Sequence, residues 1–212
     1  NQYPAVMAEY VIKPILEKYG IELVAETEGL DKDTDLSSQV NTLRRADPDI
    51  VFVASAVLSG VNLMKEAARR GLKPRIWAGT IGNIAPEVPE LGGAAVERMI
   101  MGSSFSSQTP TVRRLMETYR ERYGSDINMF GVNGYEAIYL FKAAIEAADL
   151  TNTRETLQED RRKFRDALAQ VEIESVTGER IRFNADGDAI KQGFILTIED
   201  GEYVEWDGKP FE

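Results

Sequence analysis

The chain has 212 residues, 43% of them hydrophobic, and its 35 acidic and 25 basic residues give a net charge of −10. This apolar content is enough for a folded core, and the scattered negative charge repels phosphate backbones, so nucleic acid is excluded as a partner. Histidine and cysteine are both absent, which excludes imidazole or thiol catalysis and histidine- or cysteine-bearing metal sites. We therefore expect no cofactor, no resident metal and no enzyme activity.

The first half of the chain alternates between helical and strand patterns. A helix is expected to open at Pro4, bend at Pro14 and stop at Gly20. Further helices are predicted at residues 35–46 and 58–70, and strands at 21–26, 49–54, 75–78 and 99–101. The run at 49–54 is apolar and β-branched, which is typical of a buried parallel strand. This alternation predicts βαβ units and a parallel sheet.

The second half begins after a small polar segment, GSSFSSQTP, at residues 102–110, which is a candidate linker or hinge. Helices are predicted at residues 111–123 and 135–148, the second apolar on most faces and therefore expected to be buried. A third helix should end near Gln170. Strands follow at 180–183, 193–198 and 202–206, with a turn at 184–188 and an Asp200-Gly201 hairpin turn.

One pattern of acidic residues resembles a metal-binding loop. Asp31, Asp33 and Asp35 have the spacing that opens a calcium loop, but Leu36 and Thr42 stand where glycine and a bidentate glutamate are needed. The pattern is therefore interpreted as a polar loop followed by a helix N-cap.

Six short segments, in order and at their spacing, resemble the branched-chain amino acid type of solute-binding protein of ABC transporters. They are Asn1-Gln2-Tyr3; Asp35 to Val40 with Pro48 to Val51; Arg70-Gly71-Leu72; Tyr119 to Gly124; Gly134-Tyr135-Glu136-Ala137; and Thr177-Gly178 through Phe183 to Asp188. The resemblance covers nearly the whole chain and implies the α/β, type I periplasmic-binding fold.

The resemblance also implies a division of the chain between two lobes. Residues 1–105 resemble the second ligand-binding lobe without its first strand, residues 106–189 the returning part of the first lobe, and residues 190–212 a hairpin back on the second lobe. The family places about 120 residues before this point, so the chain resembles an N-terminally truncated protein. The resemblance therefore implies a partner, either the missing N-terminal lobe or a second copy of the chain.

The candidate ligand-binding residues follow from the same resemblance. Tyr3 matches the tyrosine of the family's cleft, and Ser55 and Ala56 occupy a turn where amino acid binders place a contact. Thr80 and Ile81 stand where amino acid receptors carry an acid that pairs with the ligand's ammonium group. Because that acid is absent, the ligand is expected to be an organic or aromatic acid, an amide, or an amino acid held differently. Phe130 can form a pocket wall.

The function that the resemblance implies is capture of a small solute for a membrane ABC permease, in the periplasm or outside the cell, after removal of a signal peptide. A ligand-sensing module of a receptor or regulator is the alternative within the same fold. A carboxylate-dependent hydrolase is the alternative from another class, but no motif places a pair of acids. No apolar run approaches the roughly 18 residues of a membrane span, so membrane insertion is not expected.

Overall fold

A computed structural model describes residues 3–30 and 32–209, so the sequence predictions that involve Asn1, Gln2 and Asp31 lie outside the described residues. The chain forms two compact units. Unit 1 contains the residues up to Ser103 together with those from Ile195 onward, and unit 2 contains Ser104–Phe194. The correspondence of these units to lobes of a binding protein stays a prediction.

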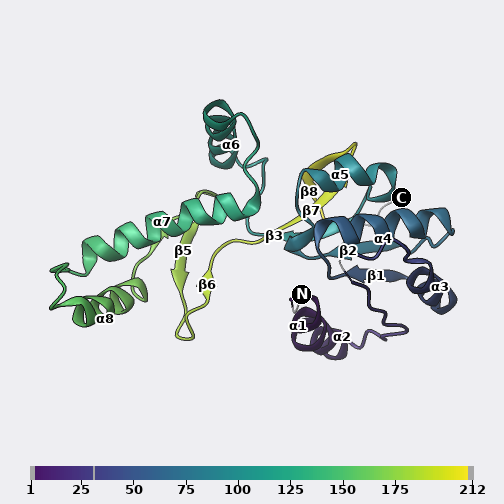
Figure 1. The fold of residues 1–212 in the computed structure, drawn as a ribbon, viewed down its shortest axis with the longest axis horizontal. Coiled ribbons are helices and arrows are strands. Elements are labelled where there is room, and N and C mark those ends of the chain that lie inside the picture. The colour runs from purple at the N-terminus through teal and green to yellow at the C-terminus, as the bar shows by residue number, and fades with distance from the viewer. Residues whose placement is uncertain (1–2, 31, 210–212) are drawn as a thin grey trace. The chain divides into compact units, whose positions relative to one another are not determined.

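Unit 1 is built on a sheet with the strand order β1-β2-β3-β7-β8 (Figure 1). Its strands are β1 (Ile50–Val53), β2 (Ile76–Gly79), β3 (Ile100–Ser103), β7 (Phe194–Glu199) and β8 (Glu202–Glu205). β1, β2 and β3 are parallel, whereas β7 and β8 form an antiparallel hairpin. Asp200 and Gly201 in its turn both have positive φ, which confirms the predicted Asp-Gly turn.

The helices of unit 1 end close to where the sequence predicted. They are α1 (Tyr3–Met7), η1 (Ala8–Ile12), α2 (Lys13–Tyr19), α3 (Ser37–Ala46), α4 (Val57–Arg69), η2 (Ile81–Asn83), α5 (Glu87–Gly92) and η3 (Gly93–Ala95). Gly20 and Asp47 close α2 and α3 in the left-handed conformation. The bend predicted at Pro14 stays a prediction; the π-helical segment η1 lies just before this proline, which lacks the N–H of a regular turn.

The core of unit 1 lies between α4 and the sheet. Val51 and Val53 of β1, Met64 and Ala67 of α4, and Met101 of β3 are all buried. Their spacing follows the periods of a strand and a helix, so each element turns one apolar face inward. The predicted buried parallel strand at 49–54 is parallel as expected, but only its alternate residues Val51 and Val53 are buried, and the other two are exposed.

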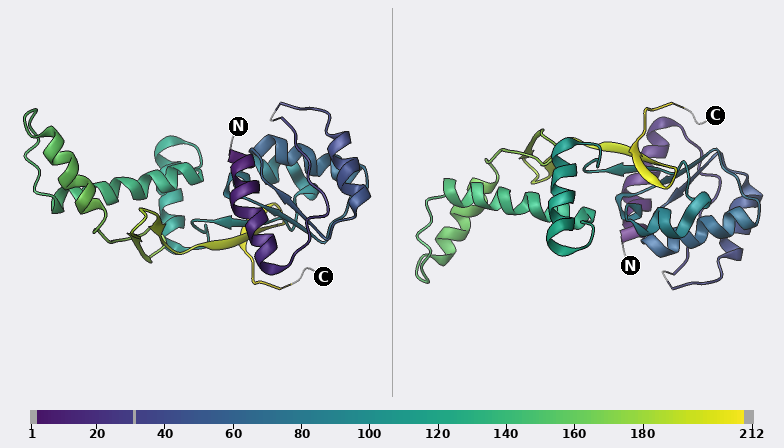
Figure 2. Two further views of the ribbon diagram at one scale, coloured as in Figure 1. Left: turned by 90° about the horizontal axis from the view of Figure 1, so that it is seen from below. Right: turned by 90° about the horizontal axis from the view of Figure 1, so that it is seen from above.

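The N-terminal helix of unit 1 has no fully buried residue. Residues 3–19 form one continuous helix (Figure 2, left), and none of its side chains is buried. α4 and this helix lie on opposite sides of β1 (Figure 1). The strand predicted at 21–26 is also wrong for this structure, since residues 21–30 adopt no regular element. A strand needs a partner for its N–H and C=O groups, and among the described residues β1 pairs with β2 alone.

Unit 2 combines three helices with a small antiparallel sheet in the order β4-β5-β6. Its elements are α6 (Pro110–Tyr123), α7 (Met129–Ala147), α8 (Leu157–Leu168), β4 (Ile173–Glu174), β5 (Arg180–Phe183) and β6 (Ala189–Ile190). α7 starts six residues earlier than predicted because the Asn128 side chain caps it by accepting a hydrogen bond from the Gly131 N–H. The expectation that α7 is buried was wrong, since Ile138 and Ile145 are more than half exposed.

A buried carboxylate organises the centre of unit 2. Glu136 of α7 accepts hydrogen bonds from the Ser175 hydroxyl and, at 3.1 Å, from the Val176 N–H. The Lys191 ammonium pairs with its other oxygen. These contacts attach the segments on either side of β5 to α7, and loss of one partner would leave a buried charge uncompensated.

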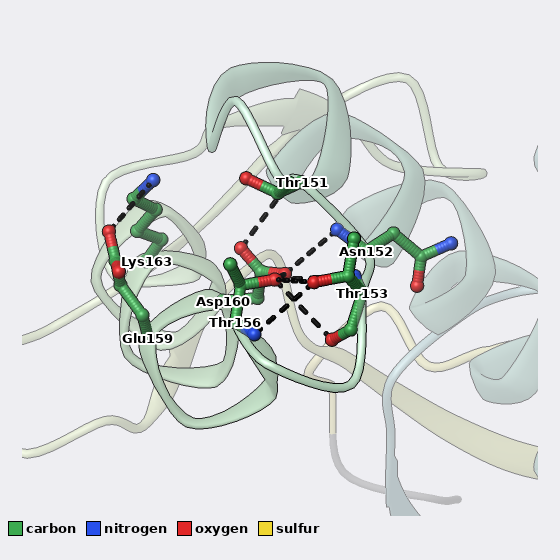
Figure 3. A network of polar contacts seen from close by, with 7 residues as sticks. All are labelled: Thr151, Asn152, Thr153, Thr156, Glu159, Asp160 and Lys163. Carbon is green, nitrogen blue, oxygen red and sulfur yellow. Dashed lines mark hydrogen bonds and ion pairs between the residues drawn. The ribbon is translucent and has the colours of Figure 1, made fainter.

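The loop between α7 and α8 closes around a second carboxylate, Asp160 (Figure 3). It accepts hydrogen bonds from the N–H groups of Thr151 at 3.2 Å and Asn152 at 2.8 Å, and from the Thr156 hydroxyl at 2.8 Å. Burial acts to raise the pKa of this carboxyl, but the hydrogen bonds outweigh it and hold the pKa below its ordinary value of 3.8. The charged form of Asp160 therefore stabilises the fold.

At neutral pH we expect Asp160→Asn to lower the thermal midpoint of unfolding by a few degrees. This is about the effect of losing the hydrogen bonds that the Asp160 carboxylate accepts. Because the folded pKa is lowered, the stabilisation is present above the ordinary pKa and is lost as the pH falls through the folded value. The difference between wild type and variant should therefore shrink below about pH 4. Asp166→Asn, at an exposed carboxylate of the same helix, is the control. A difference that does not change with pH would contradict this account.

Candidate ligand-binding site

The carboxyl ends of β1 and β2 meet at one edge of the sheet of unit 1. The parallel register places Val53 opposite Gly79, so the turns that follow, at Ser55 and Thr80, emerge side by side. The crevice outside the carboxyl ends of such strands is where open α/β folds bind ligands.

Three of the candidate residues surround one glycine at this edge. A Cβ atom placed on Gly82 would lie 3.3 Å from the Ser55 backbone oxygen, 3.3 Å from Thr80 Oγ1 and 3.7 Å from Tyr3 Cε1. These three residues therefore approach Gly82 so closely that a side chain there would be crowded. The structure thus brings together Tyr3, Ser55 and Thr80, which are far apart in the sequence.

The other candidates lie at the starts of helices. Ala56 precedes α4, whose N-terminus has no side-chain cap. Ile81 begins η2 and is half-buried. Phe130 is the second residue of α7 in unit 2 and is 73% exposed, so its role in a pocket wall stays a prediction.

The loop after β2 is held by groups that the sequence alone did not single out. Thr80 is buried, and its hydroxyl accepts a hydrogen bond from the Gly82 N–H at 3.2 Å. The Asn83 side chain is buried beneath the loop and accepts a hydrogen bond from the Thr80 N–H at 3.0 Å. The Thr80 hydroxyl is thus engaged within the loop. The only sequence signal for this arrangement was a threonine followed three residues later by an amide, as in a capping box.

Tyr203 of β8 fixes the end of the same loop. Its phenol oxygen lies 2.9 Å from the Ala85 carbonyl oxygen and 3.2 Å from that of Asn83, and it accepts a hydrogen bond from the Ala85 N–H at 3.2 Å. Burial raises the pKa of the Tyr203 phenol to about 12. The hairpin therefore supports the loop that carries Thr80 and Ile81.

The acidic pattern near residue 35 serves local structure. Asp33 accepts a hydrogen bond from the Leu30 N–H at 2.7 Å, and Asp35 accepts one from the Ser37 N–H at 2.9 Å. Within the described residues, no group of three or more acidic side chains is arranged to hold a metal ion. Over the same residues, no helix combines the length and apolar character that a membrane crossing requires.

The family model for periplasmic binding proteins matches residues 2–202 of the chain. This protein belongs to the periplasmic binding protein family. Solved structures show the same fold. A leucine-binding protein from Thermotoga maritima is 22% identical with a TM-score of 0.80, and the match covers 96% of this chain and 56% of that one.

Two further structures extend the comparison across this family. A solute-binding protein of an ABC transporter from R. palustris, in complex with benzoate, is 16% identical with a TM-score of 0.75, over 92% of this chain and 53% of that one. A protein from Brucella ovis that binds leucine, isoleucine, valine, threonine and alanine is 19% identical with a TM-score of 0.81, over 95% and 54% of the two chains. This periplasmic binding protein chain therefore spans little more than half the length of these relatives.

The raised pKa of Tyr203 predicts a loss of stability in alkali. Because the folded pKa lies above the ordinary value of 10.0, the stabilisation is complete below about pH 10 and is lost as the pH rises toward 12. A difference of two pKa units between the folded and unfolded states corresponds to about 2–3 kcal/mol in the free energy of unfolding. We expect Tyr203→Phe to be less stable than wild type at pH 8 in urea unfolding, and the difference to shrink above pH 10. Tyr10→Phe, at an exposed phenol of the same unit, should show no such change.

Proposed function

We propose that this periplasmic binding protein captures a small solute at the carboxyl edge of β1 and β2, for delivery to a membrane ABC permease. The observation that carries the proposal is the convergence of Tyr3, Ser55 and Thr80 around Gly82, in a chain that belongs to a family of binding proteins. Closure of two lobes around the solute would remove it from water and mark the loaded form for the permease. This role belongs in the periplasm or outside the cell, and binding without turnover is the activity.

The residues at this edge favour a ligand with a carboxylate or an amide over a free ammonium group. Thr80 and Ile81 provide no negative charge, and a buried ammonium group without a counter-charge costs several kcal/mol. The N-terminus of α4, which follows Ala56, has no side-chain cap and favours negative charge. The benzoate complex of the R. palustris relative shows that this fold holds an aromatic acid.

Thermal unfolding with L-leucine, benzoate and benzamide tests the proposal. A ligand at 100 times its dissociation constant adds about 2.7 kcal/mol, which raises the midpoint by about 5–10 °C for a chain of this size. We expect benzoate to raise the midpoint more than L-leucine does. Ile81→Glu should reverse this order because the carboxylate supplies a partner for the ammonium group of leucine. Ile81→Gln, in which the side chain has the shape of glutamate without its charge, should keep the order. No shift with any compound would contradict capture by this chain.

We further propose that a partner covers apolar surfaces that both units leave exposed. In unit 1 the exposed residues lie on the N-terminal helix, the following segment and β1; they are Val6, Tyr10, Val11, Ile15, Tyr19, Ile21, Leu23, Val24, Ile50 and Phe52. In unit 2 they follow one side of α7, at Ile138, Tyr139 and Ile145. Patches of this kind mark interfaces.

The part of the family fold that this chain does not span is the partner that these surfaces fit best. β1 lies at the end of a parallel run of strands, so an added strand parallel to β1 would complete its backbone hydrogen bonds. That strand would also give residues 21–26, which alternate like a strand, a neighbour to pair with. A second copy of the chain is the alternative occupant, since two β1 edges can pair directly.

Grafting tests which occupant is correct. The strand that precedes the matched region in the Thermotoga maritima protein would be fused before Tyr3. We expect the graft to raise the midpoint by about 10 °C or more, as burial of about three apolar side chains predicts, and to slow hydrogen exchange at β1. The same graft with a central proline is the control. A wild-type dimer in sedimentation with β1 already protected would instead support the second copy.

A further inference from the structure

One buried side chain joins the two turns that carry the candidate ligand contacts. The Asn83 amide accepts a hydrogen bond from the Thr80 N–H at 3.0 Å and donates one to the Ser55 hydroxyl at 3.3 Å. Asn83 is 2% exposed. Because an amide has its donor and acceptor on fixed sides, both bonds together set the position of the first turn relative to the second.

Two glycines make room for this connection. A Cβ atom on Gly60 of α4 would lie 2.6 Å from the Ser55 hydroxyl oxygen and 3.0 Å from Asn83 Nδ2. A Cβ atom on Gly79 of β2 would lie 2.7 Å from Asn83 Oδ1 and 2.3 Å from Met99 Cε. Any side chain at Gly60 would therefore press on the Ser55–Asn83 hydrogen bond itself. Glycine inside a helix is otherwise unfavourable. The steric contact with Ser55 and Asn83 therefore explains why position 60 is a glycine.

The main chain of Asn83 is anchored as well. Its carbonyl oxygen lies 3.2 Å from the Tyr203 phenol oxygen, which also contacts both backbone groups of Ala85. Asn83 is thus fixed at its side chain by the two strand-end turns and at its backbone by β8. These bonds are buried or partly buried, so the loss of one partner leaves a polar group unsatisfied.

We propose that Asn83 is a positioning residue for ligand binding, and that the Ser55 hydroxyl acts through Asn83 and not by contact with the solute. This inference rests on the proposed function for the identity of the site. In it, the Asn83 amide sets the separation of the turns at Ser55 and Thr80, while Tyr203 keeps the loop from moving away from the sheet.

A double-mutant cycle on affinity tests the inference. Ser55→Ala, Asn83→Ala and the double variant are compared by titration calorimetry with benzoate and with L-leucine. We expect each single variant to raise the dissociation constant about tenfold, as loss of one buried hydrogen bond predicts. The double variant should bind no more weakly than Asn83→Ala. If the two losses multiply, Ser55 contacts the solute independently and the inference is overturned.

Hydrogen exchange in the absence of ligand provides the second readout. Ser55→Ala should speed exchange of the Thr80 amide, which is far away in sequence, because it frees the Asn83 side chain that accepts from that amide. Ser59→Ala is the matched control, since the Ser59 hydroxyl donates to the Ala56 carbonyl and not to Asn83. An unchanged Thr80 amide in Ser55→Ala would overturn the inference. If neither compound binds wild type, the proposed function fails, while exchange still decides the role of Asn83.

A steric variant keeps the test decisive if Asn83→Ala does not fold. Gly60→Ala should speed exchange at Thr80 and lower the midpoint, although alanine is normally the better residue in a helix. Gly134→Ala is the control, because it lies inside α7 with nothing within 4 Å of the added methyl group, and its midpoint should stay the same or rise. Equal behaviour of the two variants would count against the Ser55–Asn83 connection.

Discussion

Parallel pairing of β1 with β2, in the register that sets Val53 opposite Gly79, is the constraint on which the candidate site depends. It brings the turns after both strands to the same edge, where one amide can reach both of them. A shift of one residue would turn the side chains of β1 to the opposite face. Val51 and Val53 would then leave the core, so burial of these residues also secures the register.

The same sheet explains two features of unit 1. The turns after β1 and β2 meet at one end of the sheet, and the opposite side of unit 1 leaves apolar side chains exposed. Its buried residues lie on the sheet and on α3, α4 and α5, whereas nothing between Tyr3 and Tyr19 is buried. Each large apolar side chain left in water forgoes about 1.5–3 kcal/mol of burial. A helix of this length gains most of its stability from packing, which is the physical reason for proposing a covering partner.

Buried polar groups hold together the segments that apolar packing leaves loose. In unit 2 the Glu136 carboxylate attaches the segments around β5 to α7, and Asp160 closes the loop before α8. In unit 1 the Asn83 amide and the Tyr203 phenol do the same for the loop after β2. Each group is satisfied by several partners, which is the condition under which a buried polar network stabilises one arrangement.

The sequence by itself determined the family, the order of most elements and their ends, because periodicity and the residues that stop helices act locally. Gly20, Asp47 and Asp200-Gly201 behave as their types predict. Tertiary structure decided what depends on distant neighbours. Among the described residues, the strand pattern of residues 21–26 has no strand to pair with, and α7 buries one face while Ile138 and Ile145 stay exposed. The role of Asn83 was equally hidden, because its partner Ser55 becomes its neighbour only when β1 and β2 pair.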